Sequence, residues 1–226
     1  MGNENFRFHA LRYLNGWCEI DEPRWRELSD DEDRETRLRA VQKIARRYKI
    51  SRNFRKLQDE FNGSRLTRVL DALDSIKRPD TPEDVDGAVN TLANRFKEEY
   101  GKITISAASK FLWFRYRSPV VIYDSRAHKG LNNLLKKTGN DMIMVKDHDY
   151  PAYRKVWSEQ FGQREVSESI EKACDELVSV KPFSFAWRMS DENFTRIVES
   201  RWFHERVFDD FLWWKGNYTP QSLARG

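Results

Sequence analysis

Apolar residues recur at every third or fourth position along most of the chain, which is the spacing of one face of an α-helix. After a Ser29-x-x-Glu32 capping-box pattern, the first such face consists of Leu38, Val41, Ile44, Ala45 and Tyr48. The same spacing predicts further helices over about 66–76, 82–100, 107–116, 125–137, 150–161, 165–180 and 190–213.

Turn residues mark where several of these helices begin and end. Thr81 with Pro82 at the first helical position opens one helix, and Gly101 is placed to close it. Ser118-Pro119 breaks the next helix. The strand-like apolar runs at 120–123 and 142–145 are too short to build a sheet. We therefore expect an all-α protein.

Length and residue types narrow the functional class. A chain of 226 residues forms one sizeable domain or two small lobes, and no window approaches the ~20 apolar residues of a membrane span. The N-terminus has no signal-peptide apolar region, and Phe6 stands where a myristoylation motif has Ser or Thr. Two cysteines and four scattered histidines offer no disulfide framework and no metal-ligand spacing. We expect a cytoplasmic, reduced protein with no metal, no cofactor and no membrane partner.

Charge is distributed unevenly along the chain. Residues 34–68 hold twelve basic residues against three acidic ones, and residues 101–137 hold eight basic residues and one carboxylate, Asp124. From 163 to 210 the balance reverses, with eleven acidic and seven basic residues. Separated basic blocks are typical of a nucleic-acid binder, whereas a set of solvated helix faces is the alternative.

The segment 104–131, TISAASKFLWFRYRSPVVIYDSRAHKGL, has a definite order of parts. A turn leads into a helix that starts with small residues and continues with aromatic ones; a break and an apolar stretch follow, and Asp124 opens the next helix. This order resembles the core of the helix–hairpin–helix DNA glycosylase superfamily, which includes the 8-oxoguanine, adenine-mismatch and endonuclease III types. Ser106 falls 18 residues before Asp124, where bifunctional members carry a catalytic lysine, and Ala108 matches a small residue of that helix.

The sequence also departs from the family pattern. Gly101-Lys102-Ile103-Thr104-Ile105 stands where the hairpin usually has Gly-x-Gly, so the hairpin element is degenerate. Ser106 replaces the lysine, although Lys110 lies one turn later on the same helix face, and the iron–sulfur cysteines of some members are missing. The resemblance implies two helical lobes with a cleft between them that holds the site. The middle lobe would span residues 30–122, and the other residues 1–29 plus 123–226.

Asp124 suits the chemistry that this resemblance implies. Breaking an N-glycosidic bond builds positive charge on the sugar, and a nearby carboxylate stabilises that charge and orients or deprotonates a water. The surrounding cations and a helix N-terminus both favour the ionised form of Asp124. The alternative is an ordinary helix N-cap, a role that Asp fills often.

Other residues take supporting roles in this interpretation. Lys110 is a candidate for a Schiff base with the sugar; a phosphate contact or a solvated lysine is the alternative that we favour. We therefore expect a monofunctional enzyme that leaves an abasic site. Substrate-binding candidates, which would line the site or stack on a flipped base, are Ser106, Trp113, Tyr123 and Trp187.

Basic and loop residues supply the candidate DNA contacts. Lys102, Arg115, Arg117 and Arg126 are expected to bind phosphates. Arg52, Asn53 and Arg55 lie in a loop that either enters the duplex as a wedge or clamp or simply connects two helices.

Three functions remain open from the sequence. The first is a monomeric DNA glycosylase that flips and removes a damaged or modified base, in base-excision repair or in defence against phage with modified DNA. The second is a non-catalytic nucleic-acid-binding module on the same scaffold. The third is a helical interaction protein whose charge blocks meet protein partners.

Overall fold

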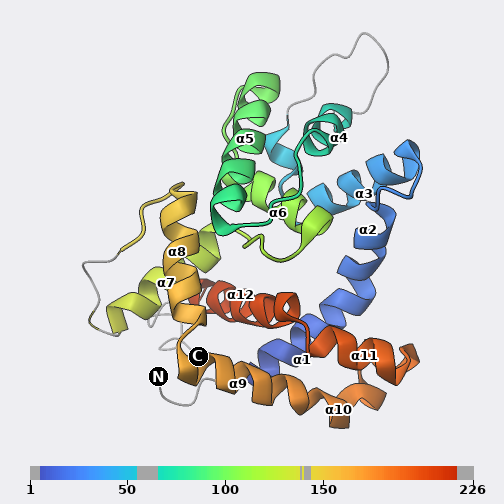
Figure 1. Ribbon diagram of the computed structural model, residues 1–226, viewed down its shortest axis with the longest axis vertical. Coiled ribbons are helices and arrows are strands. Elements are labelled where there is room, and N and C mark those ends of the chain that lie inside the picture. The colour runs from blue at the N-terminus through green and yellow to red at the C-terminus, as the bar shows by residue number, and fades with distance from the viewer. Residues whose placement is uncertain (1–5, 55–65, 138, 140–143, 218–226) are drawn as a thin grey trace, which may run out of the picture. The chain divides into compact units, whose positions relative to one another are not determined.

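The computed structural model describes residues 6–54, 66–137, 139 and 144–217. All regular secondary structure in these residues is helical, so the protein is all-α as expected (Figure 1). The chain divides into two compact units, Ile20–Ile122 and a unit formed by Met1–Glu19 with Tyr123–Gly226. We call them the middle unit and the terminal unit. Residues 20–29 group with the middle unit, whereas the sequence analysis assigned them to the other lobe.

The middle unit contains five α-helices and one 3-10 turn in its described residues. These are α2 (Glu22–Glu27), α3 (Arg34–Arg47), η2 (Ser51–Asn53), α4 (Thr67–Asp74), α5 (Pro82–Tyr100) and α6 (Ile105–Tyr116). The start of α5 is as predicted, because Thr81 and Asp84 form a reciprocal capping box and Pro82 follows. Gly101 ends the helix with a φ of +74°, a backbone conformation that favours glycine.

The start of α3 differs from the prediction. Asp33, not Ser29, is the N-cap, and its carboxylate accepts the backbone N–H groups of Glu35 and Thr36. Asp33 has extended backbone angles directly before the first helical turn, which is the geometry that an N-cap requires. Ser29 lies in the preceding turn instead.

Helix α6 forms the centre of the middle unit. Nine of its twelve residues are buried, including the consecutive run from Ala107 to Phe114. Phe111 joins an aromatic cluster with Phe54, Phe96 and Tyr100, in which the Phe54 ring lies 5.2 Å from that of Phe96 and 5.0 Å from that of Tyr100. A helix that is apolar on nearly every face has to be covered by its neighbours, and α3 and α5 both pack against it.

The terminal unit is built around its last helix. Its elements are α1 (Phe6–Gly16), α7 (Ser125–Lys137), α8 (Tyr150–Phe161), α9 (Arg164–Asp175), α10 (Leu177–Val180), η4 (Lys181–Phe183), η5 (Phe185–Arg188), α11 (Asp191–Val198) and α12 (Arg201–Asn217); a π-helical turn, η1 (Trp17–Asp21), follows α1. Helix α12 packs against α1, α7 and α9.

Two long helices predicted in the terminal unit are each divided. The segment 165–180 forms α9 and α10. The segment 190–213 forms α11 and α12 with a turn at Glu199 and Ser200, where the Ser200 hydroxyl donates to the Ile197 carbonyl at 2.6 Å. Such local side-chain bonds compete with helical backbone bonds and favour an interruption. Among the described residues, no helix has the length and apolar character needed to cross a bilayer.

Candidate functional site

Asp124 sits at the N-terminus of α7. Its Oδ1 accepts the backbone N–H of Arg126 at 2.9 Å, and its carbonyl accepts the N–H of His128 at 2.8 Å. The residue is half-buried, so its carboxylate is a helix cap that solvent still reaches. The cap geometry agrees with both interpretations drawn from the sequence, since the catalytic carboxylate of the resembled family is also a helix cap.

Tyr123, immediately before Asp124, is almost fully buried. Its hydroxyl donates to the Asp147 carboxylate at 3.2 Å and accepts the backbone N–H of His148 at 3.1 Å. Its ring meets Tyr153 edge-on, with centroids 5.0 Å apart. Burial raises the pKa of Tyr123, so this hydroxyl stays protonated at neutral pH. Tyr123 is therefore packed inside the terminal unit, next to Asp124 in the chain, and does not present an open ring face.

Two further side chains of α7 hold the segment that precedes α8. Asn132 both donates to the Val145 carbonyl, at 3.1 Å, and accepts the Val145 N–H, at 3.0 Å. His128 Nε2 bonds the same carbonyl at 2.9 Å, and its Nδ1 lies 3.2 Å from Asp147. These contacts tie residues 145–147 to the first turns of α7 and brace the helix that begins after Asp124.

A buried carboxyl group lies near Asp124 in the same unit. Asp209 on α12 accepts the indole N–H of Trp157 at 2.8 Å and the guanidinium of Arg206 at 2.8 Å. Burial raises the pKa of Asp209 to about 6, and the nearby charge of Asp124 contributes to that rise although Arg206 and Trp157 oppose it. Burial and the same Asp124 charge also raise the pKa of Tyr153. The terminal unit therefore holds two carboxyl groups in different environments, one reached by solvent and one enclosed.

Lys110 and Ser106 form a separate contact inside the middle unit. Lys110 is only 3% exposed, and its Nζ donates to the Ser106 Oγ at 2.7 Å. The Nζ also lies 6.0 Å from the centre of the Tyr48 ring, whose hydroxyl donates to Asp21 at 2.9 Å. Lys110 is thus enclosed and not solvated. Lys110 and Ser106 are four residues apart, a spacing that places both side chains on one helix face, as predicted from the sequence.

The remaining aromatic candidates lie in opposite environments. Trp113 is buried in the middle unit, edge-on to Phe114 at 5.1 Å, and so contributes to packing there. Trp187 is 57% exposed on η5 of the terminal unit.

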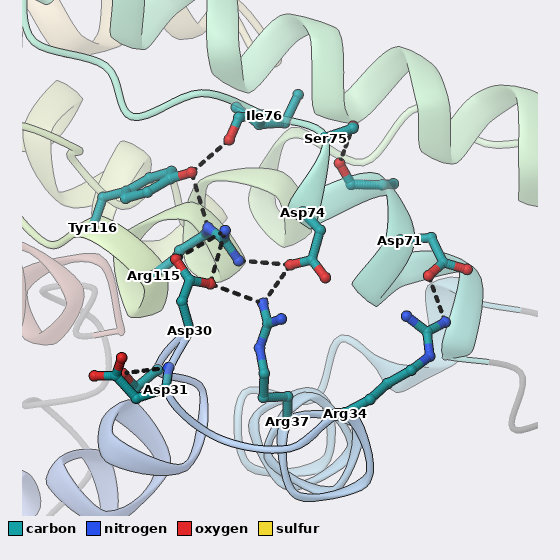
Figure 2. Close-up of polar contacts among 12 residues, drawn as sticks. Asp30, Asp31, Arg34, Arg37, Asp71, Asp74, Ser75, Ile76, Arg115 and Tyr116 are labelled. Atoms are coloured by element: carbon teal, nitrogen blue, oxygen red, sulfur yellow. Dashed lines mark hydrogen bonds and ion pairs between the residues drawn. The ribbon is translucent and has the colours of Figure 1, made fainter.

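Arg115, predicted to bind phosphate, is held by carboxylates of its own unit (Figure 2). It pairs with Asp74 at 2.6 Å and Asp30 at 3.0 Å, and both of these carboxylates also pair with Arg37. The Arg115 Nε donates to the Tyr116 hydroxyl, which in turn donates to the Ile76 carbonyl. The side chains of Arg37 and Arg115 are 12% and 11% exposed, so this cluster ties α3, α4 and α6 together, and we leave Arg115 out of the proposed DNA contacts.

The other predicted DNA contacts lie mostly at the surface. Arg126 is exposed, with its guanidinium 5.0 Å from the centre of the Trp213 ring, and Arg117 is half-buried and 4.0 Å over Trp25. Lys102 and Arg52 are exposed, and Asn53 is half-buried. Arg55 lies outside the described residues.

The cations of α3 divide into two groups that the sequence did not distinguish. Toward the N-terminus they pair with carboxylates: Arg34 with Asp71, Arg37 with Asp74, Arg39 with Glu35 and Lys43 with Glu27. Beyond these, Arg46 and Arg47 at the end of α3, Lys49 just after it and Arg52 in η2 are exposed and have no carboxylate partner among the described residues. We call these four the α3-end cations. Three of them were not singled out from the sequence, where they look no different from their paired neighbours.

No group of three or more His, Cys, Asp or Glu side chains in the described part of the chain is arranged to hold a metal ion. The chain matches no family model, no curated protein and no solved structure.

Proposed function

We propose that the protein is a DNA glycosylase that hydrolyses the N-glycosidic bond of a damaged or modified base, with Asp124 as its catalytic carboxylate. The observation that carries the proposal is the setting of Asp124, a solvent-reached carboxylate fixed at the first turn of α7. The order of parts around it, from Ser106 to Leu131, also resembles the glycosylase core.

The reaction requires one bond to break and one to form at the sugar carbon C1′. As the C1′–N bond breaks, the base leaves with the electron pair and takes up a proton from the solvent, while positive charge develops on the sugar. The ionised Asp124 stabilises that charge and orients a water, whose oxygen bonds to C1′ and whose proton passes to the carboxylate. The carboxylate then returns this proton to the solvent, so that water is consumed and no net proton is. The product is an abasic site.

The burial of Lys110 bears on whether a second, strand-cleaving step follows. A lysine nucleophile has to be withdrawn from water, and Lys110 is enclosed. Its Nζ is however already held by the Ser106 hydroxyl on the same helix, at 2.7 Å. We therefore propose hydrolysis without a lyase step.

The α3-end cations support nucleic acid as the partner. Arg46, Arg47, Lys49 and Arg52 cluster at the end of α3 and in η2, and no carboxylate among the described residues neutralises them. Such a cluster attracts phosphates by releasing their counterions. The biological setting that we propose is repair or defence against phage with modified DNA.

The test is mass-spectrometric detection of free bases after incubation with normal, damaged and phage-type modified DNAs. Wild-type protein should release one base, and Asp124→Asn should lose that release while keeping DNA binding, because Asn caps a helix almost as well as Asp. Asp149→Asn is the matched control, since Asp149 caps α8 through the Ala152 N–H at 3.1 Å and has no assigned chemistry.

Borohydride trapping tests the lyase step separately. A covalent protein–DNA adduct that disappears in Lys110→Gln would show that Lys110 forms a Schiff base and that the enzyme is bifunctional. The absence of an adduct, with base release intact, is the expected result.

A second candidate function is a non-catalytic nucleic-acid-binding module. The observation in its favour is that Asp124 already has a complete structural role as the cap of α7. Equal DNA binding by wild type and Asp124→Asn, with no base released from any DNA, would favour this function over the glycosylase.

A further inference from the structure

Exposed apolar side chains gather in one short part of the terminal unit. Val178, Phe183, Phe185 and Trp187 are 61%, 89%, 58% and 57% exposed. The other large exposed apolar residues among those described, Phe8, Ile103 and Met144, are scattered along the chain. Large apolar side chains that are exposed close together along the chain are typical of interaction sites in soluble proteins. We call Val178, Phe183, Phe185 and Trp187 the aromatic platform.

The alternation of side chains in this segment is the reverse of the usual one. Ser184 and Ala186 point inward and are buried, whereas the three aromatic residues between and beside them face solvent. Folding normally buries the aromatic positions, because each large ring brings roughly 150–250 Å² out of water. A segment that served only to connect α10 with α11 would gain stability from the opposite arrangement.

The platform backbone is fixed, not loose. Asn15 of α1 accepts the Phe185 N–H at 2.9 Å, and the Ser184 hydroxyl donates to the Lys181 carbonyl at 2.8 Å while accepting the Ala186 N–H. Lys181 pairs with Asp191 at the start of α11. The rings are therefore held outward on a braced surface, and little conformational entropy is lost when a partner covers them.

Charges around the platform indicate what kind of partner covers it. Exposed carboxylates precede it at Asp175 and follow it at Asp191 and Glu192, and Asp191 is 98% exposed even though it pairs with Lys181. Arg188 lies over the Trp187 ring at 4.5 Å. Arg188 therefore already occupies the Trp187 face. A polyanion would meet the like charges of Asp175, Asp191 and Glu192, whereas Lys or Arg side chains of a partner would meet these carboxylates and the open rings of Phe183 and Phe185, which attract cations.

We propose that the aromatic platform binds a protein segment whose apolar side chains are flanked by lysine or arginine. The apolar residues cover Phe183, Phe185 and Trp187, and the flanking cations face Asp175 and Glu192. This interaction does not rest on the proposed glycosylase activity, because it is argued from the exposure of the platform and the charges beside it. Trp187 is the one platform residue that the sequence analysis also named as a candidate for stacking on a flipped base.

Selection from a phage-displayed library of random peptides on the full chain tests the proposal. Phe183→Ser/Trp187→Ser serves for counter-selection, because both side chains are exposed and their loss leaves the core intact. Enriched peptides should combine apolar residues with flanking Lys or Arg. Labelled copies should bind at least about tenfold more weakly to the double variant, as aromatic hot spots do. Phe8→Ser, which removes an exposed ring outside the platform, should bind like wild type.

A second double variant tests the role of the carboxylates. Asp175→Asn/Glu192→Gln should weaken peptide binding and reduce the salt dependence of that binding. Failure to enrich peptides that depend on Phe183 and Trp187, or enrichment of peptides with acidic flanks, would overturn the proposal. The proposal would also be overturned if the wild type formed a concentration-dependent dimer that the Phe183→Ser/Trp187→Ser variant did not form. That result would assign the platform to a second copy of the chain. Loss of single-stranded oligonucleotide binding in the same variant would assign it to nucleic acid.

Discussion

Gly130 of α7 and Gly216 of α12 allow the two helices to cross with their backbones in contact. A Cβ atom on Gly130 would lie 1.9 Å from the Leu212 carbonyl oxygen, and one on Gly216 would lie 1.8 Å from the Arg126 carbonyl oxygen. Both obstacles are backbone atoms, so no side-chain rotation can relieve them. This crossing fixes the helix that begins after Asp124 directly against the helix that carries Asp209.

Gly130→Ala should therefore destabilise the protein by about 3 kcal/mol or more, at the upper end of the cost of overpacking, because the helices have to separate. Urea unfolding followed by circular dichroism measures the change. Gly87→Ala is the matched control, since Gly87 lies inside α5 with no atom within 4 Å of an added Cβ. That variant should gain about 0.5–1 kcal/mol, the usual benefit of replacing glycine in a helix. Equal effects at the two positions would contradict the close crossing.

Asp209 should make stability depend on pH. Its pKa rises from an ordinary 3.8 to about 6 in the folded protein, so between these values the folded state binds a proton that the unfolded state has lost. Stability should fall as pH rises through this window, by about 3 kcal/mol if each pKa unit corresponds to about 1.4 kcal/mol. Urea unfolding of wild type and Asp209→Asn across the window isolates this contribution.

The informative quantity is the difference between those two pH profiles. Asp209→Asn should be less stable throughout, because Arg206 loses its carboxylate, but it should lack the decline attributed to Asp209. Parallel profiles for the two proteins would show that Asp209 titrates in its ordinary range. Carbon-detected NMR of the Asp209 carboxyl group gives the same answer in the wild type alone.

The ion-pair cluster in Figure 2 should contribute much more to the free energy of unfolding than a surface ion pair does. Asp74→Asn removes a carboxylate shared by Arg37 and Arg115, whose guanidinium groups are largely buried, and should cost about 3 kcal/mol in free energy of unfolding. Asp71 lies on the same helix as Asp74 and pairs with Arg34 of α3, and both side chains of this pair are more than half exposed. Asp71→Asn should therefore lower the free energy of unfolding by less than about 1 kcal/mol. Thermal and urea unfolding of both variants measure these losses of stability. Similar losses for Asp74→Asn and Asp71→Asn would show that the cluster is no stronger than a surface ion pair.

The α3-end cations should control the salt dependence of DNA binding. Replacing Arg46, Arg47 and Arg52 by Gln should lower affinity on all duplex sequences, because fewer DNA phosphates are then neutralised. The slope of log K against log salt should become shallower by about 0.9 for each phosphate that the variant no longer neutralises. Arg39→Gln/Lys43→Gln is the control, because both cations already pair with glutamates. Fluorescence anisotropy over a salt series measures both slopes, and an equal reduction in the control would show that pairing does not separate the two groups.

Local signals in the sequence were enough to predict most of the helices. The 3–4 spacing predicts α3 to α8, and Thr81, Pro82 and Gly101 fix both ends of α5 because caps and positive φ values are local properties. Ser29 was a wrong choice of cap for α3, since Asp33 offers the same chemistry closer to the first helical turn. Where two neighbouring residues can both cap, the sequence does not rank them.

Long-range pairing is what the sequence could not supply. Arg115 looked like a phosphate contact because its carboxylate partners, Asp30 and Asp74, lie 85 and 41 residues away along the chain. The same limitation hid the difference between Lys43 and Arg46, because Lys43 pairs with Glu27, which lies 16 residues away and outside α3. The Lys110–Ser106 contact, by contrast, follows from a spacing of four residues within one helix.

The carboxamide of Asn132 gives Val145 the pair of hydrogen bonds that an adjoining strand would give in a sheet. One side chain of α7 thus satisfies both backbone groups of Val145, in the segment that leads to Asp149, the N-cap of α8. Because the tether originates two turns after Asp124, a displacement of that residue by a ligand would be transmitted to the start of α8. Helix α7 and the entry to α8 should therefore respond to binding as one mechanical element, and a change at Asp124 should be detectable from probes on α8.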